Sequence, residues 1–198
     1  MKVHFLKTTD YKLMPWKNGL GSTTEIIIDP PGSSIAENNF EWRLSSATLN
    51  SAGPFSQFKG YDRYLTLIDG TQVRLTIDGN VKTLKLHEVI KFSGDQQVVS
   101  SKPDWTFKDL GLIFQRDLID AQFHFLSAKK VEQLTTGTYI VFACNGSTEV
   151  KIDKTFEKKL TVNQTAIVQV KKYEIAEMTI TPDTESLFVI IKIFAKIK

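Results

Sequence analysis

Short runs of alternating apolar and polar residues, broken by turn-forming residues, dominate the chain. Such alternation predicts β-strands, because successive side chains of a strand point to opposite faces. The runs rich in β-branched and aromatic residues are Thr24–Asp29, Phe40–Leu49, Tyr64–Ile68, Gln72–Ile77, Val81–Leu86, Tyr139–Ala143, Glu149–Ile152, Ala166–Val170 and Leu187–Phe194. Asp69-Gly70, Asp78-Gly79-Asn80, Gly94-Asp95 and Asn145-Gly146 separate them as turns. Only Ala128–Leu134 indicates one or two helical turns, so the pattern predicts an all-β sandwich or barrel.

Three segments recur in order at offsets of 75 or 76 residues. The pairs are Tyr64–Gly70 with Tyr139–Gly146, Leu75–Asp78 with Val150–Asp153, and Leu84–Glu88 with Leu160–Gln164. Generic hairpins also resemble one another, but a nearly constant offset favours an internal duplication. The pattern resembles the cupin superfamily, whose small β-barrels often occur as fused pairs. We therefore expect a bicupin, with a first barrel in residues 1–118, a second in residues 119–198, and some strands crossing between them.

Composition and charge narrow the class of partner. The 198 residues are 41% hydrophobic, and 25 basic against 22 acidic residues give a net charge of +3. This excess is too small to predict nucleic-acid binding. The single Cys144 allows no internal disulfide, the first residues lack a signal-peptide core, and Leu187–Phe194 is too short to span a bilayer. We expect a cytoplasmic protein with neither nucleic acid nor membrane as partner.

The segment Met14–Ile26 combines an aromatic ring, a cation, an amide, two glycines, hydroxyls and a carboxylate. Gly19 and Gly21 permit close backbone approach and leave N–H groups free to meet an anion or a carbonyl. A plain loop leading into the strand at Thr24 explains the same composition. Both interpretations stay open on the residues alone.

A second polar group falls on alternating positions of two predicted strands. Glu41, Arg43 and Ser45 share one face of their strand, and Arg63 shares its face with Leu65 and Leu67. An arginine on an apolar face needs a partner or a ligand. Glu25 is a candidate partner for Arg43 or Arg63, so a structural ion pair and a ligand site are equally compatible with the pattern.

These segments together resemble the HutD/Ves family, bicupin proteins of bacteria associated with histidine utilisation. The matching segments are Met14–Gly19, Thr23-x-Glu25-Ile26, Trp42–Ser45, Gly53–Ser56, Gly60, Asp62-Arg63, Leu65–Leu67, Gly70, Phe92–Asp95 and Asp109-Leu110. They cover residues 5–118, and the remainder resembles the family by architecture. Leu20 and Gly111 depart from the family pattern, which has glycine and asparagine there, and so leave the substrate open.

The resemblance implies a small-molecule pocket in the first barrel and a structural second barrel. The implied ligand-binding residues are Trp16, Lys17, Asn18, Thr23, Glu25, Trp42, Arg43, Ser45, Phe55 and Arg63. Such a set suits a small polar or anionic metabolite, because arginine offers a planar fork to a carboxylate and tryptophan a flat wall. Urocanate and formimidoyl- or formyl-glutamate fit this chemistry, and many other metabolites do as well. An accessory or regulatory role in histidine degradation follows from the family association.

The residues favour no metal, no cofactor and no catalytic machinery. His4, His87 and His124 are not at ligand spacing, and Cys144 has no neighbouring base in sequence. Two alternatives stay open: a metal-independent isomerase or hydrolase using Glu25 with Lys17 or Arg43 as acid–base groups, and an interaction scaffold. Long strands such as Leu187–Phe194 also make a homodimer plausible.

Overall fold

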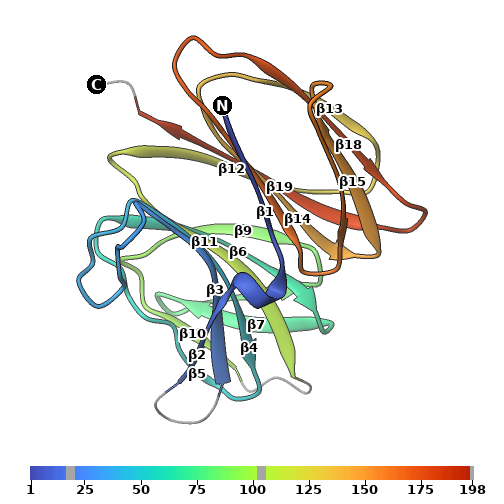
Figure 1. Ribbon diagram of the computed structural model, residues 1–198. Coiled ribbons are helices and arrows are strands. Elements are labelled where there is room, and N and C mark those ends of the chain that lie inside the picture. The colour runs from blue at the N-terminus through green and yellow to red at the C-terminus, as the bar shows by residue number, and fades with distance from the viewer. Residues whose placement is uncertain (17–20, 102–105, 197–198) are drawn as a thin grey trace. The chain divides into compact units, whose positions relative to one another are not determined.

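A computed structural model describes residues 1–16, 21–101 and 106–196, and the prediction of an all-β chain is confirmed (Figure 1). Besides strands, these residues form one three-residue 3-10 helix, Thr8–Asp10. No helix among them is long and apolar enough to cross a membrane. The strands are β1 Lys2–Leu6, β2 Lys12–Pro15, β3 Gly21–Asp29, β4 Trp42–Leu49, β5 Gly53–Pro54, β6 Tyr61–Asp69, β7 Gln72–Ile77, β8 Asn80–Lys85, β9 Val89–Ser93, β10 Val98–Ser100, β11 Phe107–Gln115, β12 Ile119–Leu126, β13 Lys130–Leu134, β14 Gly137–Asn145, β15 Ser147–Ile152, β16 Phe156–Thr161, β17 Thr165–Val170, β18 Ala176–Pro182 and β19 Leu187–Ala195.

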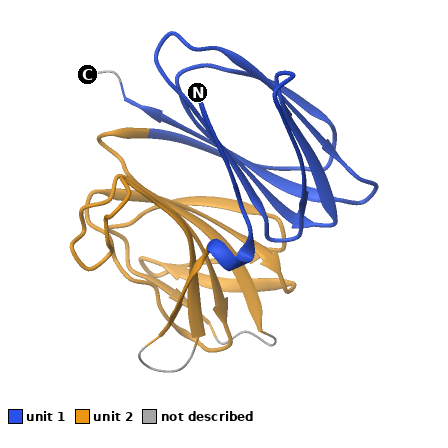
Figure 2. Cartoon of the chain, in the orientation of Figure 1, with its two compact units in different colours: residues 1–10, 120–198 blue, residues 11–119 orange. Residues whose placement is uncertain are grey.

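The chain divides into two compact units, shown in different colours in Figure 2. Unit 2 comprises Tyr11–Ile119 and holds a six-stranded sheet, β2-β3-β4-β11-β6-β9, and a four-stranded sheet, β5-β10-β7-β8. Unit 1 comprises Met1–Asp10 and Asp120–Lys198. It holds a five-stranded sheet, β1-β17-β14-β19-β12, and a four-stranded sheet, β13-β18-β15-β16. In each unit one apolar cluster draws side chains from both sheets, so the two sheets of a unit enclose its core.

Both units repeat one order of eight strands. The series β4-β11-β6-β9 and β5-β10-β7-β8 of unit 2 matches β12-β19-β14-β17 and β13-β18-β15-β16 of unit 1, strand for strand in chain order. The strands outside this repeat are β2 and β3 in unit 2 and β1 in unit 1. β1 pairs with β17, which places residues 1–10 with the C-terminal half of the chain, whereas the sequence pattern suggested the first 118 residues as one unit.

The turns repeat together with the strands. Asp78 and Asp153 both have positive φ, 46° and 49°, directly after β7 and β15. Asp78 exchanges two hydrogen bonds of 2.9 Å with the backbone of Gln97, one through its N–H and one through Oδ1. Asp153 makes the same two bonds, at 2.8 Å, with Glu177. A short acidic side chain that tolerates left-handed backbone thus closes the equivalent corner of each unit.

One local expectation from the sequence was wrong. The segment expected to form helical turns instead contains strand β13, Lys130–Leu134, which pairs with β18 along its whole length. Leu134 is fully buried while Lys130 and Val131 are exposed. Burial of one side chain against the core and ladder hydrogen bonds to β18 outweigh the weak helical propensity of this short segment.

Candidate functional site

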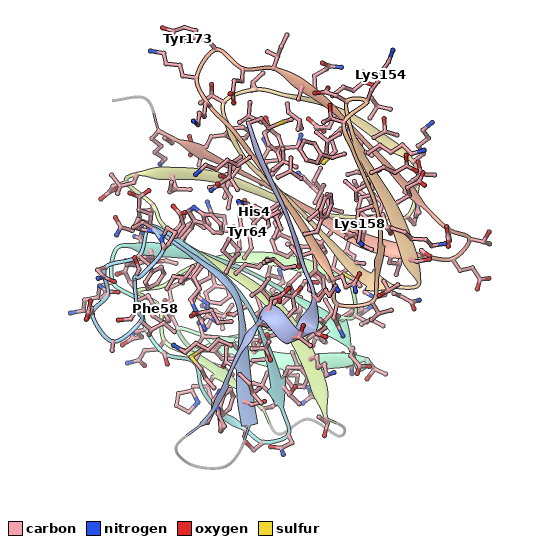
Figure 3. All side chains as sticks on the ribbon, viewed as in Figure 1. His4, Phe58, Tyr64, Lys154, Lys158 and Tyr173 are labelled. Carbon is pink, nitrogen blue, oxygen red and sulfur yellow. The ribbon has the colours of Figure 1, made fainter. Side chains whose placement is uncertain are left out.

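Unit 2 encloses a cavity of about 680 Å³ that opens beside its core. Its wall contains apolar residues from loops and strands, among them Ile35, Phe58 and Ile113. Phe58, labelled in Figure 3, lies in the segment between β5 and β6 and is 9% exposed. The charged residues of the wall, Arg43, Arg63 and Asp109, come from β4, β6 and β11, three neighbouring strands of the large sheet. A largely apolar cavity with a few convergent polar groups is typical of a small-molecule site.

Arg43 of β4 supplies the first of these polar groups and is 3% exposed. Its Nε donates to Glu25 Oε2 at 2.7 Å, and its Nη1 donates to Ser45 Oγ at 3.0 Å. Its Nη2 is buried and finds no hydrogen-bond partner among the described residues. The candidate ion pair of Glu25 is therefore formed with Arg43, and it fixes the guanidinium so that Nη2 stays available.

Arg63 of β6 supplies the second cation. Its guanidinium carbon lies 5.0 Å from the ring centre of Phe55 and 5.5 Å from that of Phe92. Nη1 reaches the backbone oxygen of Ser56 only at 3.5 Å, and buried Nε has no partner among the described residues. Burial, followed by the nearby charge of Arg43, lowers the pKa of Arg63 to about 10 against the opposing effect of Asp109. Arg63 is still a cation at neutral pH.

Trp16 forms a wall of the cavity at the end of β2. Its Nε1 donates to Thr23 Oγ1 at 2.9 Å, which fixes the orientation of the ring. The ring packs closely on β3: a Cβ added at Gly21 would lie 2.9 Å from the indole and 2.7 Å from the backbone oxygen of Thr48. Gly21 is thus required for the ring to approach the sheet, as the glycine-rich motif in the sequence suggested.

Three cavity residues on β11 were not among the candidates from sequence: Asp109, Gly111 and Ile113. Asp109 is 4% exposed, and its Oδ1 accepts a hydrogen bond of 2.7 Å from the N–H of Ala47. Burial raises the pKa of Asp109 to about 6, opposed by the Ala47 bond and by the charges of Arg63 and Arg43. The signal in the sequence was an acid directly before an apolar run, Leu110–Phe114, where an ionised side chain needs a reason to be buried.

The structure brings most of the expected residues to one place. Six line the cavity: Trp16, Thr23, Arg43, Ser45, Phe55 and Arg63. Glu25 acts one step away, through Arg43. Trp42 is buried but is not part of the cavity wall, because adjacent residues of β4 point to opposite faces. Lys17 and Asn18 lie outside the described residues.

Histidine and cysteine, the usual metal ligands and nucleophiles, are not among the described residues that line the cavity. Over residues 1–16, 21–101 and 106–196, no three His, Cys, Asp or Glu side chains are grouped so that they could hold a metal ion. Cys144 is buried on β14 of unit 1, and burial raises the pKa of its thiol. A buried protonated thiol is a poor nucleophile. The cavity wall offers guanidinium, carboxylate, hydroxyl and indole groups to a ligand.

Known proteins similar to this chain agree with the motifs. The chain is 32% identical over 152 residues, 76% of its length and 78% of the relative's, to a 21.2 kDa protein in the hutC 3′ region of Pseudomonas putida. It is 36% identical to the protein Ves of Citrobacter koseri over 57% of this chain and 60% of that one. The solved structure of HutD from Pseudomonas fluorescens SBW25 superimposes with a TM-score of 0.85 at 28% identity, over 98% of this chain and 100% of the other. The family model described as HutD matches residues 8–188, and the chain therefore belongs to the HutD family, which is linked to the histidine-utilisation locus.

Proposed function

We propose that this chain is a bicupin that binds a small carboxylate of histidine degradation in the cavity of unit 2 and acts as an accessory or regulatory protein. Candidate ligands are urocanate and formimidoyl- or formyl-glutamate. The family link to the histidine-utilisation locus supports the pathway, and the repeated eight-strand units support the paired-barrel architecture. The proposal requires neither a metal nor catalysis.

One observation carries the proposal: two buried guanidinium groups line one cavity and each has an unused N–H. Arg43 Nη2 and Arg63 Nε are buried without a hydrogen-bond partner among the described residues. Leaving a buried charged donor unpaired costs roughly 1–3 kcal/mol or more for each group, so proteins rarely do so without a functional reason. A carboxylate presents two acceptor oxygens in one plane and matches such donors.

The first test is a thermal-shift screen with urocanate, N-formyl-L-glutamate, formimidoyl-L-glutamate, L-glutamate, L-histidine and unrelated sugars. A ligand of the folded state raises the melting temperature by mass action. We expect a shift from one of the pathway acids that is unaffected by a chelator. No shift from any of these acids would contradict the proposal, as would proton NMR spectra showing that the bound acid is consumed, because that would favour the enzyme alternative.

Matched variants assign the shift to the cavity. Arg63→Gln removes one of the two cavity cations, whereas Arg74→Gln removes an exposed cation of the same unit on β7. We expect Arg63→Gln to weaken binding about 10- to 100-fold, since a charged hydrogen bond is lost, and Arg74→Gln to leave binding unchanged. Arg63→Lys distinguishes the contribution of the positive charge from that of the planar guanidinium, because lysine keeps the charge but lacks the planar fork. Equal binding by all three variants would place the ligand elsewhere.

A further inference from the structure

The cavity contains a buried acid as well as two buried cations. Asp109 lies where the pairing of β4 with β11 skips two residues, between the pairs Lys108–Thr48 and Gly111–Ser45. At this interruption the N–H of Ala47 donates a hydrogen bond to Oδ1 of Asp109 instead of to the backbone of β11. The fold therefore holds the carboxylate in a fixed orientation in the cavity wall.

The other oxygen of Asp109 is not used by the fold. Within the described residues, no hydrogen bond reaches Oδ2, and no arginine or lysine nitrogen there lies within ion-pair distance of Asp109. Arg43 and Arg63 influence this carboxyl through their charges but do not contact it as ion pairs. An acceptor with a free lone pair thus lies in the same cavity wall as the two unused guanidinium N–H groups.

The charges of the site constrain what can bind. Among the described residues of the site, Glu25 and Asp109 formally cancel Arg43 and Arg63, so the carboxylate of a ligand adds a negative charge near that of Asp109. An N–H group on the ligand leaves the net charge unchanged, but by donating to Asp109 it stabilises the ionised carboxylate. A ligand with only acceptor groups would place its oxygen lone pairs against those of the Asp109 carboxylate. That contact is repulsive unless Asp109 is protonated and donates a hydrogen bond.

We propose that the site selects small acids that also carry an N–H donor, with the carboxylate of the ligand on Arg43 Nη2 and Arg63 Nε and its N–H on Asp109 Oδ2. This inference rests on the proposed function and defines its ligand class: acylated amino acids, amidines and imidazole or pyrrole acids, in preference to nitrogen-free dicarboxylates. Asp109 is then the residue that determines specificity, and the arginines supply the general affinity for acids.

The test uses two pairs of acids that differ in the N–H group. The first pair is urocanate and 3-(3-furyl)acrylate, which are close in shape. The second is N-formyl-L-glutamate and N-formyl-N-methyl-L-glutamate. Glutarate completes the set as a dicarboxylate without nitrogen. Dissociation constants are measured by isothermal titration calorimetry at pH 8, where Asp109 is ionised. We expect each N–H acid that binds to do so about 10- to 100-fold more tightly than its partner, as in other sites built around a hydrogen bond to the ligand.

The variant Asp109→Asn provides the second arm. Its Oδ1 still accepts the Ala47 N–H, so the strand pairing is kept, but its Nδ2 donates where Oδ2 accepted. We expect the preference for N–H acids to disappear while binding of glutarate stays equal or improves. If wild-type protein binds both members of each pair equally, the inference is overturned and the proposed function stands. If no acid binds at all, both are overturned.

Discussion

Unit 1 and unit 2 share one eight-strand arrangement, but positions that carry charged side chains on the cavity wall of unit 2 carry buried apolar side chains in unit 1. One backbone hydrogen bond that recurs in both units identifies which residues of the two units are equivalent. The N–H of His87 donates to the oxygen of Leu67 at 3.0 Å, and the N–H of Asn163 donates to that of Ala143 at 2.7 Å. Leu67 of β6 is thus equivalent to Ala143 of β14, an offset of 76 residues.

The strand registers extend this correspondence to the site. Asp109 pairs with Leu67 and Phe188 pairs with Ala143, so Asp109 and Phe188 are equivalent too. Gly111 pairs with Leu65 and Ile190 pairs with Val141, so Gly111 is equivalent to Ile190. Two residues before Leu65 and Val141 lie Arg63 and Tyr139, which are therefore equivalent as well. The three residues of unit 1, Tyr139, Phe188 and Ile190, are each at most 2% exposed and belong to one apolar cluster.

The comparison shows how one architecture gives an apolar core in one copy and a cavity lined by charged residues in the other. An acid, a glycine and a cation occupy positions where unit 1 has two aromatic rings and an isoleucine. The added strands β2 and β3 then contribute Trp16 and Glu25, which have no counterpart in the repeated strands. Unit 2 gives up apolar packing at these positions, and the cavity and its unused donors are the result.

The largest effect is expected from Phe188→Ala in unit 1. Removing a fully buried aromatic ring from a filled core destabilises a protein by about 3–5 kcal/mol. Urea unfolding followed by circular dichroism measures the loss. The matched control is Phe156→Ala on β16, where the ring is 37% exposed and the loss is expected to stay below about 1 kcal/mol. Similar losses in both variants would show that unit 1 is not filled at Phe188 as described.

Gly111→Ile gives unit 2 the isoleucine that unit 1 has at the equivalent position, Ile190. A Cβ at Gly111 would meet its nearest neighbours, Leu65 Cδ1 and Tyr64 O, at 3.6 Å, which is ordinary contact, so the fold tolerates the change. The side chain would fill cavity space between β4 and β6. We expect binding of N-formyl-L-glutamate to weaken about 100-fold, comparable to the loss of a charged hydrogen bond, while stability is kept. Unchanged affinity by calorimetry, with Gly111→Ala as the control, would contradict the location of the site.

Asp109→Asn alters the pH dependence of stability. The pKa of Asp109 is 3.8 in the reference state and about 6 in the folded protein, so the folded protein binds more protons between these values. Its free energy of unfolding therefore falls as pH rises from about 4 to about 6 and stays lower above, by roughly 2–3 kcal/mol in total. The variant lacks this decrease. Urea unfolding at pH 4, 5, 6 and 7 should give a stability difference that grows with pH in favour of the variant, and a constant difference would refute the burial of an ionisable Asp109.

Trp16→Phe with Thr23→Val tests the wall contributed by the added strands, and the expected effect is the smallest. The hydrogen bond from Trp16 Nε1 to Thr23 Oγ1 is partly buried, and such a bond contributes about 1 kcal/mol. We expect a coupling energy of that size in a double-mutant cycle of unfolding free energies. Additive single variants would indicate that the bond does not fix the ring.

The sequence was most informative about local structure and least about pairing. Alternation and turn residues predicted β7 within its observed bounds, Gln72–Ile77, and most other strands approximately. The repeat was visible, but it matched Tyr64 with Tyr139, whereas the structure makes Arg63 the equivalent of Tyr139. Strands β6 and β14 are related by an offset of 76 residues and β7 and β15 by 75, because two residues join β6 to β7 and only Gly146 joins β14 to β15. A sequence match cannot locate such a difference.

The candidate site was foreseen in its cations and in Glu25, but Asp109 was not among the candidate ligand-binding residues. Arg63 stood out because a cation on an apolar strand face needs a partner, and Arg43 because it shares a polar strand face with Glu41 and Ser45. Strand alternation separated Trp42 from Arg43, yet could not tell which face lines a cavity. Asp109 and Gly111 come from a third strand, β11, that lies between β4 and β6 only because of long-range pairing. The pairing of β1 with β17 was hidden for the same reason.

The most direct test of carboxylate binding by the buried guanidinium groups is NMR of the arginine Nε–Hε resonances during titration with N-formyl-L-glutamate. Arg63→Gln assigns the Arg63 signal, and exposed Arg74 serves as the internal reference. If the account is correct, the Arg63 Hε signal moves downfield as its unused N–H gains an acceptor, and it saturates at the dissociation constant found by calorimetry. If the acid binds while the Arg63 signal stays unchanged, the cavity cations do not hold it, and the central claim is wrong.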